Sequence, residues 1–378
     1  MKNKNIFMDL SHFFLLIFLL IKELSCFSQY YTNLYNWLIS NGAFISKKII
    51  PVEHDKYNRY IKSTDIINKN EEIIFIPNEL TLSTLNSKVS EVCNNGFKEY
   101  NTYATKEEKF SYDFDCLVYF LTIDINNTNS FFVHFYNYFP EISKNDFPLY
   151  FPEEKISLLE QIELDSEIQR QKYFFNKSLN PVKNEILKMK NGLEKFRQNF
   201  ILVSTRNLER RNSFFEEVNT LVPFLDLLNH NNDFNAWFFY DEKREGFSLY
   251  TIKNIDKNEE ITISYGKLNN VYLYSIYGFT IKDNIYRANI NVKLFGKKIT
   301  LFPNNKQTQI KKVIKLYKDI DERKLIAEFK KSLVNRLNKY QNVLSKFKND
   351  INIINICNDL ISTVKEYISL SEKLFLSN

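Results

Sequence analysis

The chain of 378 residues is poor in glycine, cysteine, methionine and tryptophan, with 7, 4, 3 and 2 copies respectively, whereas phenylalanine and tyrosine number 34 and 23. The cysteines are Cys26, Cys93, Cys116 and Cys357, which lie far apart and form no C-x-x-C pair. This spacing excludes a zinc site of the usual kind, so no metal is expected. The scarcity of glycine bears on any motif that normally needs a glycine backbone.

The sequence also lacks an apolar run of membrane-spanning length at its N-terminus. The run Phe13–Ile21 has nine residues, whereas a spanning helix needs about 20. Lys2 and Lys4 precede it, and the more polar segment Ser25–Ser28 follows, which is the layout of a secretory signal peptide. We expect residues 1–28 to be a leader that is removed after Ser28, leaving no stable membrane span.

A mature amphipathic helix is the alternative for this segment. A leader implies the secretory pathway or a plastid-type organelle, and without a leader the expected compartment is the cytoplasm.

Charge is unevenly distributed along the chain. Residues 291–378 hold 18 Lys+Arg against 8 Asp+Glu, and the remainder holds 33 against 37. A basic C-terminal lobe favours an acidic partner surface, and a solvated lysine-rich helical face is the alternative. Few aromatic residues interleave with the basic ones, which argues against nucleic acid as the partner.

Hydrophobic periodicity divides the chain into segments of different character. Leu34, Trp37 and Leu38 share one helical face, and Asn41-Gly42 is expected to end that helix. The phrase Asp65–Pro77 predicts a polar turn and a β-branched strand, and it recurs in similar form at Ile255–Ile263.

The middle and the C-terminal parts of the chain read as mainly helical. Residues 86–200 form a helix-rich segment punctuated by prolines. After Phe279, apolar residues step by three or four and predict two long amphipathic helices. The first stripe is Phe329, Leu333, Leu337, Tyr340, Leu344 and Phe347, and the second is Leu360, Val364, Tyr367, Ile368 and Leu374.

Two motifs are the most informative part of the sequence about fold and function. An apolar run, Leu221–Leu228, ends in Asn229-His230, and Glu259–Ile263 leads into Ser264-Tyr265-Gly266 some 35 residues later. This order resembles the signature of SET-domain methyltransferases, and most closely the subgroup typified by the Rubisco large-subunit lysine methyltransferase.

The resemblance implies an α+β protein, in which a SET-domain β-fold is interrupted by a helical insertion and followed by an all-α C-terminal lobe that binds substrate. The expected segments are 29–85 and 201–282 for the SET domain, 86–200 for the insertion and 283–378 for the lobe. The implied activity is transfer of a methyl group from S-adenosylmethionine (AdoMet) to a lysine of a non-histone protein. A histidine acceptor is an alternative, because some relatives use one.

The family assigns roles to residues that match its motifs. Tyr265 matches the catalytic tyrosine that orients the incoming nitrogen, and the alternative is one more core tyrosine among 23. Asn229 and His230 match the pair at the adenine edge of the cofactor, although Asn-His is also ordinary turn chemistry. Tyr277 and Phe279 match a Tyr-Gly-Phe that stacks on adenine or closes the channel, with a core role as the alternative.

Further matches lie upstream of these motifs. Arg206 stands 23 residues before Asn229 and matches an arginine that reaches the cofactor carboxylate, a task that suits a guanidinium. Leu208, Arg210 and Asp226 fall where the family lines its substrate pocket. For Arg210 an equally good alternative is a solvated surface pair with the neighbouring arginine, Arg211.

One expected element is missing. Most SET domains carry a Gly-x-Gly before the first Asp-Ile turn, but this chain has Tyr57-Asn58-Arg59 there. Asn58, which tolerates left-handed backbone, is the residue expected to contact the cofactor, and Tyr57 or Arg59 would crowd a glycine position. Three explanations stay open: the backbone adapts, the alignment differs locally, or the chain has lost AdoMet binding and is a protein-binding module on a SET scaffold.

Overall fold

A computed structural model describes residues 29–53, 57–96, 106–211 and 217–376, so the expected leader over residues 1–28 lies outside the described residues. The chain forms two compact units. The first comprises Met1–Ile142 and Pro181–Ser264, and the second comprises Ser143–Asn180 and Tyr265–Asn378.

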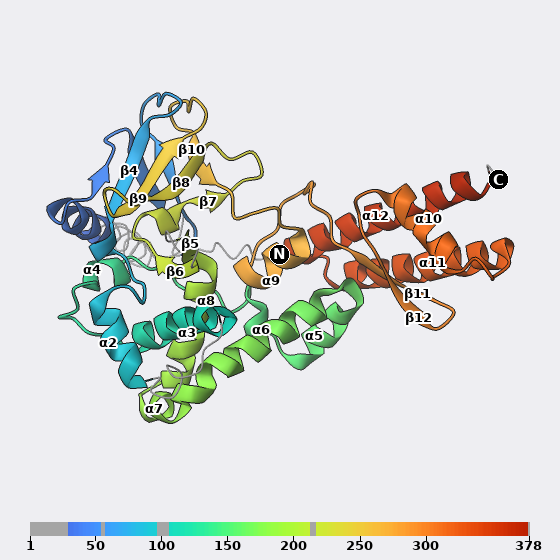
Figure 1. Cartoon of the computed structure of the whole chain (residues 1–378), viewed down its shortest axis with the longest axis horizontal. Helices are drawn as coiled ribbons and strands as arrows, with labels where there is room; N and C mark the ends of the chain where they lie inside the picture. The colour runs from blue at the N-terminus through green and yellow to red at the C-terminus, as the bar shows by residue number, and fades with distance from the viewer. Residues whose placement is uncertain (1–28, 54–56, 97–105, 212–216, 377–378) are drawn as a thin grey trace, which may run out of the picture. The chain divides into compact units, whose positions relative to one another are not determined.

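The first unit contains two four-stranded sheets, with the strand orders β1-β4-β9-β8 and β2-β3-β10-β7, and the separate pair β5-β6. Strand β7 runs parallel to β10, and the other pairings in these sheets are antiparallel. Figure 1 shows β4, β8, β9 and β10 gathered in one region of this unit. The strands are β1 Phe44–Ile45, β2 Ile49–Glu53, β3 Arg59–Ser63, β4 Glu72–Pro77, β5 Asn207–Arg211, β6 Glu217–Leu221, β7 Asn229–His230, β8 Ala236–Asp241, β9 Gly246–Thr251 and β10 Glu260–Ile263.

The strand prediction for the repeated phrase is confirmed. The first copy becomes β4, whose Ile73, Ile74 and Ile76 are fully buried, and the second becomes β10. The two copies meet at an isolated antiparallel bridge between Ile67 and Ile255, so their turns lie side by side. Runs of β-branched residues, buried at consecutive positions, account for both strands.

The helix predicted before Gly42 is also confirmed, over residues 29–40. Leu34 and Leu38 are fully buried on its inner face. Gly42 has a φ of +89°, and its N–H donates to the carbonyl of Ile39. A left-handed residue after the last turn is how many helices end, and glycine adopts this conformation without a steric cost.

The other helices of the first unit include a packed pair, α3 and α8, where the buried Asn199 amide donates to the Thr122 hydroxyl at 3.2 Å. Cys93 on α2 and Cys116 on α3 form a disulfide, and both cysteines are fully buried. The helical segments here are η1 Asn78–Leu80, α2 Ser87–Gly96, α3 Lys106–Asp124, α4 Val133–Tyr136, α7 Lys183–Lys188, α8 Gly192–Arg206 and η6 Leu225–Leu227.

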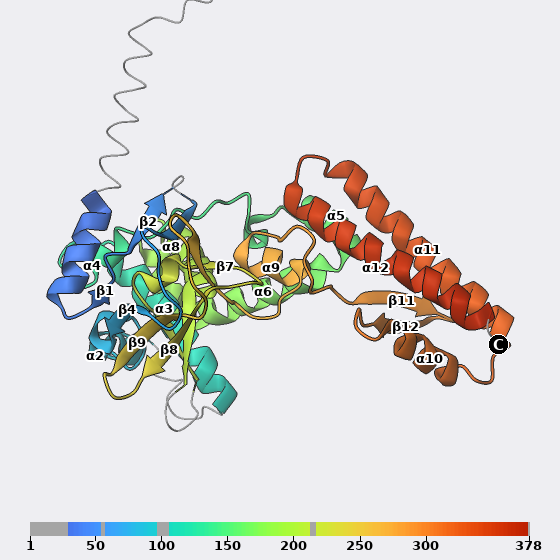
Figure 2. The same ribbon diagram turned by 90° about the horizontal axis from the view of Figure 1, so that it is seen from above.

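The second unit is mainly helical. Figure 2 shows α11 and α12 running antiparallel as a long pair, with α10 and the hairpin β11–β12 beside them. Its elements are η3 Pro148–Tyr150, α5 Glu153–Leu159, η4 Glu160–Ile162, α6 Leu164–Leu179, α9 Asn270–Tyr277, β11 Ile290–Leu294, β12 Lys297–Leu301, α10 Lys306–Leu316, α11 Glu322–Lys346 and α12 Ile351–Leu376; η5 Asn180–Val182 falls at the boundary between the units.

The two apolar stripes predicted after Phe279 are confirmed as the seam between α11 and α12. Phe329, Leu333, Tyr340, Val364 and Tyr367 are at most 1% exposed. The buried residues of α11 and α12 belong to one hydrophobic core cluster, which also includes residues of α5, α6 and α9. Burial of one apolar face on each helix is what holds such a pair together.

The hairpin β11–β12 was not predicted within this mostly helical stretch. Its turn is Phe295-Gly296, with φ angles of +46° and +83°. Two consecutive positive φ values characterise the tight turns that match the twist of antiparallel strands. The alternation of buried Ile290, Val292 and Leu294 with polar residues was the available signal.

The contact-defined units divide the chain differently from the predicted segments, because part of the helical insertion, Ser143–Asn180, groups with the C-terminal part. The predicted segment boundaries themselves stay predictions. Among the residues that the structure describes, no helix combines the length and apolar character of a membrane span.

The disulfide leads to a stability prediction. Replacing Cys93 and Cys116 by serine should lower the free energy of unfolding by about 2–4 kcal/mol, because a cross-link over 23 residues restricts the unfolded chain. Urea denaturation with and without dithiothreitol measures this. The reductant should destabilise the wild type and leave the double variant unchanged; equal curves for all four samples would contradict the bond.

Candidate active site

A buried carboxylate lies at the centre of the first group of predicted site residues. Asp226 sits on η6, and its side chain is 3% exposed. Arg206, the last residue of α8, places Nη1 3.6 Å from Asp226 Oδ2 and donates a hydrogen bond to the Asp226 carbonyl. Burial raises the pKa of the Asp226 carboxyl, while Arg206, then Arg59, and the backbone N–H of Phe224 oppose that rise.

The turn that presents Asp226 has an unusual backbone. Phe224 has a φ of +72° although it is not glycine, and its ring is fully buried. Positive φ is costly for a bulky residue and persists where surrounding packing enforces it. Here the conformation directs the Phe224 N–H toward the Asp226 carboxylate.

Arg59, which stands at an expected glycine position, belongs to the same cluster. It is 7% exposed, donates to the carbonyl of Tyr138 and lies 4.6 Å above the Tyr138 ring, with Glu53 Oε1 3.9 Å from its Nε. Burial lowers the pKa of Arg59, Glu53 opposes this, and the like charge of Arg206 adds to it. Two guanidiniums therefore share one buried region with two carboxylates.

The missing glycines impose no backbone strain on this segment. Asn58 and Arg59 do not have a φ in the left-handed region, and Arg59 begins the extended strand β3. The backbone here therefore accommodates residues other than glycine, and each of the three explanations for the missing motif stays a prediction. Asn58 and Tyr57 are exposed.

The Asn229-His230 pair forms the short strand β7 beside β10. Asn229 aligns with Thr262 and His230 with Ile263. The Asn229 side-chain amide donates to the Arg59 carbonyl at 3.2 Å and to Glu260 Oε1 at 2.9 Å. This amide thus joins the segment that lacks glycine to the strand that leads into the Ser-Tyr-Gly motif.

His230 is half-buried, and burial lowers its pKa, against the opposing effects of the Ile263 backbone and the Asn232 side chain. The neutral imidazole is therefore the favoured form at neutral pH. No group of three or more His, Cys, Asp or Glu residues suited to a metal ion occurs among the described residues.

The two remaining candidates of the first unit lie on β5. Leu208, which is half-buried, pairs with Thr220, and Arg210 pairs with Val218. The side chain of Arg210 falls outside the described part of the chain, so its proposed role stays a prediction.

The aromatic candidates belong to the second unit and lie together. The ring centroids of Tyr265 and Tyr277 are 4.9 Å apart, and those of Tyr277 and Phe279 are 6.2 Å apart. Gly266 and Gly278 have φ angles of +118° and +77°, so each motif glycine follows its tyrosine in a conformation that other residues rarely adopt. All three aromatic rings are half-buried.

Sequence reasoning missed several partners of these residues. Glu53 and Tyr138 surround Arg59, and Asn235 fixes β10 by accepting from the Thr262 N–H at 2.9 Å and donating to the Glu260 carbonyl at 2.8 Å. A single tyrosine among 23 has no local signature, and the contact between Tyr138 and Arg59 joins residues 79 positions apart.

Comparison with known proteins identifies the class. The sequence matches the SET domain over residues 58–266, which is more than half of the chain. The chain therefore belongs to the SET-domain family, as predicted, and it resembles the methyltransferases of that family.

Two curated relatives support the assignment over part of their length. SET domain-containing protein 4 of Artemia parthenogenetica is 27% identical over 180 residues, which is 45% of either chain. SET domain-containing protein 8 of Schizosaccharomyces pombe is 44% identical over 61 residues, 16% of this chain and 14% of that protein. The matches thus span less than half of each relative.

Solved structures extend the likeness to the whole fold. The SET domain of LSMT bound to lysine and AdoHcy aligns with a TM-score of 0.64 at 14% identity, covering 92% of each chain. Rubisco LSMT bound to AdoMet aligns with a TM-score of 0.61, also at 14% identity, over 91% of this chain and 92% of that one. The predicted α+β class with long C-terminal helices is confirmed, and the hairpin β11–β12 is added to it.

The buried carboxylate leads to a second prediction. Asp226→Ala should lower the free energy of unfolding by about 3–5 kcal/mol, because it removes a buried counter-charge from Arg206 and Arg59. Asp233→Ala is the matched control, since its side chain is 92% exposed and pairs with Lys253 on the surface. The control should change stability by less than about 0.5 kcal/mol in urea denaturation. Similar losses in both variants would contradict the cluster.

His230 leads to a prediction about pH. Its pKa is lowered in the folded state, so the unfolded chain, with a histidine pKa of about 6.5, binds the proton more readily. The stabilisation is present above pH 6.5 and is lost as the pH falls through the folded-state pKa. Chemical denaturation of wild type and His230→Gln between pH 8 and 5 should show a shallower loss in the variant. Parallel curves would contradict this role.

Proposed function

We propose that the protein is an AdoMet-dependent protein-lysine N-methyltransferase acting on a non-histone protein. The observation that supports this most is the buried Arg206–Asp226 pair beside Asn229-His230 within a SET domain. The LSMT structures with the same fold are described as bound to AdoMet, AdoHcy and lysine, and we extend these ligand classes to this chain as part of the proposal.

The residues present fit the cofactor at its charged end. Arg206 Nε is buried and has no hydrogen-bond partner among the described residues, while Nη1 is held by Asp226. A buried donor without a partner costs free energy, and a carboxylate is a strong acceptor for a guanidinium. Arg206 would therefore hold the cofactor carboxylate, and Asn229 and His230 would line the adenine edge.

AdoMet supplies a methyl group on a sulfonium that is already electrophilic, so the protein contributes mainly aim and electrostatics. The substrate lysine must first lose a proton, which costs roughly 4–5 kcal/mol at pH 7 from a pKa of ~10.4. An apolar channel disfavours the ammonium and reduces that cost. In this proposal the Tyr265 hydroxyl orients the neutral nitrogen, and the Tyr277 and Phe279 rings exclude water.

Arg59 favours a second candidate function, a protein-binding module without AdoMet. Its buried guanidinium interacts electrostatically with both Arg206 and Asp226, so it lies in the neighbourhood proposed for the cofactor carboxylate. We favour the enzyme because Arg59 is engaged by Tyr138 and Glu53, which leaves Arg206 Nε for a ligand.

We also propose entry into an oxidising compartment through the N-terminal leader. The Cys93–Cys116 disulfide supports this, since disulfides persist mainly in secreted and organellar proteins rather than in a reducing cytosol. The layout of residues 1–28 is the other support.

Two measurements test the catalytic proposal. Calorimetry should detect binding of AdoHcy to the wild type, and Tyr265→Phe should keep that affinity within about twofold. Methyl transfer from radioactive AdoMet to proteins of a cell extract should fall by a factor of about 100 or more in Tyr265→Phe, the size of effect seen when one orienting hydrogen bond is removed.

Tyr286→Phe is the matched control, since it removes a hydroxyl from a half-buried tyrosine outside the proposed site. It should transfer methyl groups like the wild type. No heat with millimolar AdoHcy would favour the binding module instead, and full activity of Tyr265→Phe would remove that residue from the mechanism.

A further inference from the structure

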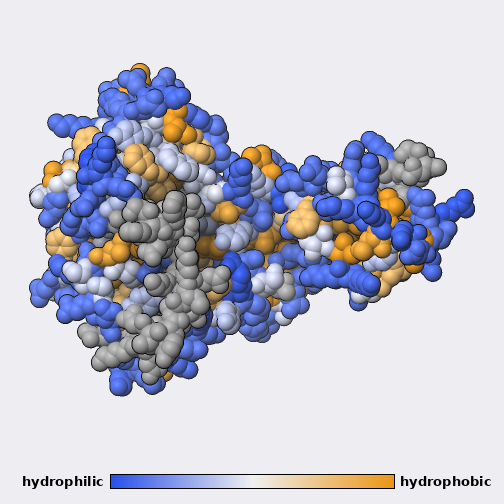
Figure 3. Space-filling model, in the orientation of Figure 1, coloured by the Kyte–Doolittle hydropathy of each residue, from blue (hydrophilic) through white to orange (hydrophobic). Residues whose placement is uncertain are grey.

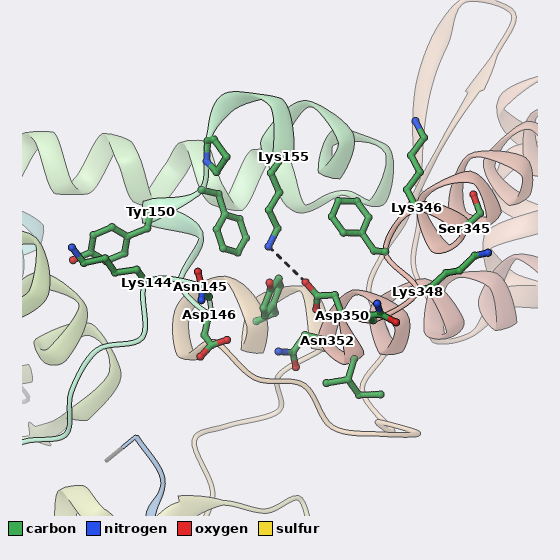
Figure 4. A pocket seen from close by; sticks show the side chains of 16 residues that line it. Lys144, Asn145, Asp146, Tyr150, Lys155, Ser345, Lys346, Lys348, Asp350 and Asn352 are labelled. Atoms are coloured by element: carbon green, nitrogen blue, oxygen red, sulfur yellow. Dashed lines mark ion pairs between the residues drawn. The ribbon is translucent and has the colours of Figure 1, made fainter. Parts of the chain in front are cut away.

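The second unit contains a cleft that none of the predicted site residues lines. Its volume is about 870 Å³. One wall is the segment Lys144–Lys155, which includes η3 and the start of α5, and Tyr274 of α9 also lines the cleft. The other wall, residues 345–352, is the end of α11, the turn that follows it and the start of α12 (Figure 4).

The centre of the cleft is an ion pair packed on an aromatic ring. Lys155 Nζ lies 3.6 Å from Asp350 Oδ2 and 3.6 Å from the centroid of Phe151. Asp350 also accepts a hydrogen bond from the Ile353 N–H at 3.2 Å and so caps α12. This carboxylate is therefore committed to Lys155 and to the start of α12 within the protein.

The rim of the cleft is basic. Lys346 and Lys348 are exposed, and Figure 4 shows both extending from the α11–α12 turn away from the Asp350 carboxylate. Lys144 stands on the opposite wall, 5.4 Å from the centroid of Tyr150. The lining holds four lysines against two aspartates, Asp146 and Asp350.

The charge of the whole unit has the same sign. Its two segments, residues 143–180 and 265–378, hold 5 and 21 basic residues against 7 and 9 acidic ones, a net charge of +10. The first unit is at −4, because the chain as a whole is at +6. Figure 3 shows hydrophilic residues over most of the visible surface, with apolar residues in scattered groups. The field of this unit therefore attracts anionic chain segments toward the cleft.

The shape and lining favour a polypeptide over a small anion. Phe151 and Tyr274 line the cleft but are only 6% and 1% exposed, so the accessible aromatic surface is that of Phe347, which is half-buried between the two rim lysines. The amides of Asn145 and Asn349 also line the cleft. Aromatic surface accepts an apolar side chain, amides pair with an extended main chain, and rim ammoniums pair with carboxylates.

We propose that this cleft is a docking site for an acidic segment of the protein substrate, with an apolar side chain against Phe347 and carboxylates at Lys346 and Lys348. The inference rests on the proposed function for the identity of the partner as a substrate. The docking chemistry itself depends only on the second unit.

The test uses the full chain and a fluorescein-labelled peptide of alternating Asp and Glu around a central Phe, read by fluorescence anisotropy at low salt. The Lys346→Glu/Lys348→Glu variant should bind at least tenfold more weakly than wild type. Lys311→Glu/Lys312→Glu, which makes the same charge change at exposed positions of α10 outside the cleft, should lose less than threefold. Lys346→Ala/Lys348→Ala should weaken binding in the same direction, by a smaller factor, without introducing negative charge at the end of α11.

Several outcomes would overturn the docking site. Equal losses in the two charge-reversed variants would mean that only net charge matters, and tighter, variant-sensitive binding of single-stranded RNA would assign the cleft to nucleic acid. Undetectable binding of the peptide at millimolar concentration would leave the cleft without this role. AdoHcy calorimetry on the same samples separates the two proposals. If the wild type does not bind AdoHcy, the methyltransferase proposal fails, whereas the docking site is judged by the peptide result alone.

Discussion

The placement of the candidate site in the first unit depends on one buried arrangement of charge, in which Arg206 and Arg59 surround Asp226 and Glu53 stands beyond Arg59. The cluster joins the end of α8, the turn η6 and the start of β3. Its most distant members in the sequence, Arg59 and Asp226, are 167 positions apart. Because a buried charge is costly unless a counter-charge lies near it, the contacts of Arg206 and Arg59 with these carboxylates favour this placement of the three elements. The strand β7 follows directly from that turn, and its Asn229 amide returns to the Arg59 carbonyl.

Much of this arrangement was predictable from local patterns. The phrase shared by Asp65–Pro77 and Ile255–Ile263 predicted β4 and β10, because a polar turn followed by β-branched residues has few other solutions. The stripes of α11 and α12 were predictable because 3.6-residue periodicity over about four to five turns is a strong signal. The hairpin β11–β12 was missed because its strands are short and its turn uses Phe295-Gly296 rather than Asn-Gly.

Motif order, which local sequence preserves, was enough to propose candidate residues but not their contacts. It singles out Arg206, Asp226, Asn229, His230 and Tyr265, whose roles stay predictions. Arg59 was read as an obstruction at a glycine position, and its partners Tyr138 and Glu53 were not found at all. Long-range pairing of this kind leaves no trace in a single sequence, since neither partner differs locally from any other buried tyrosine or surface glutamate. The disulfide was missed for the same reason, because spacing alone does not reveal which cysteines meet.

The arginine at position 59 has a consequence for how this segment tolerates change. Glycine at this position would offer no guanidinium to the Tyr138 ring and carbonyl, and the half-buried Glu53 carboxylate would lose its neighbouring cation. Removing one charge of such a pair costs more than removing both, so positions 53 and 59 are better exchanged together than singly.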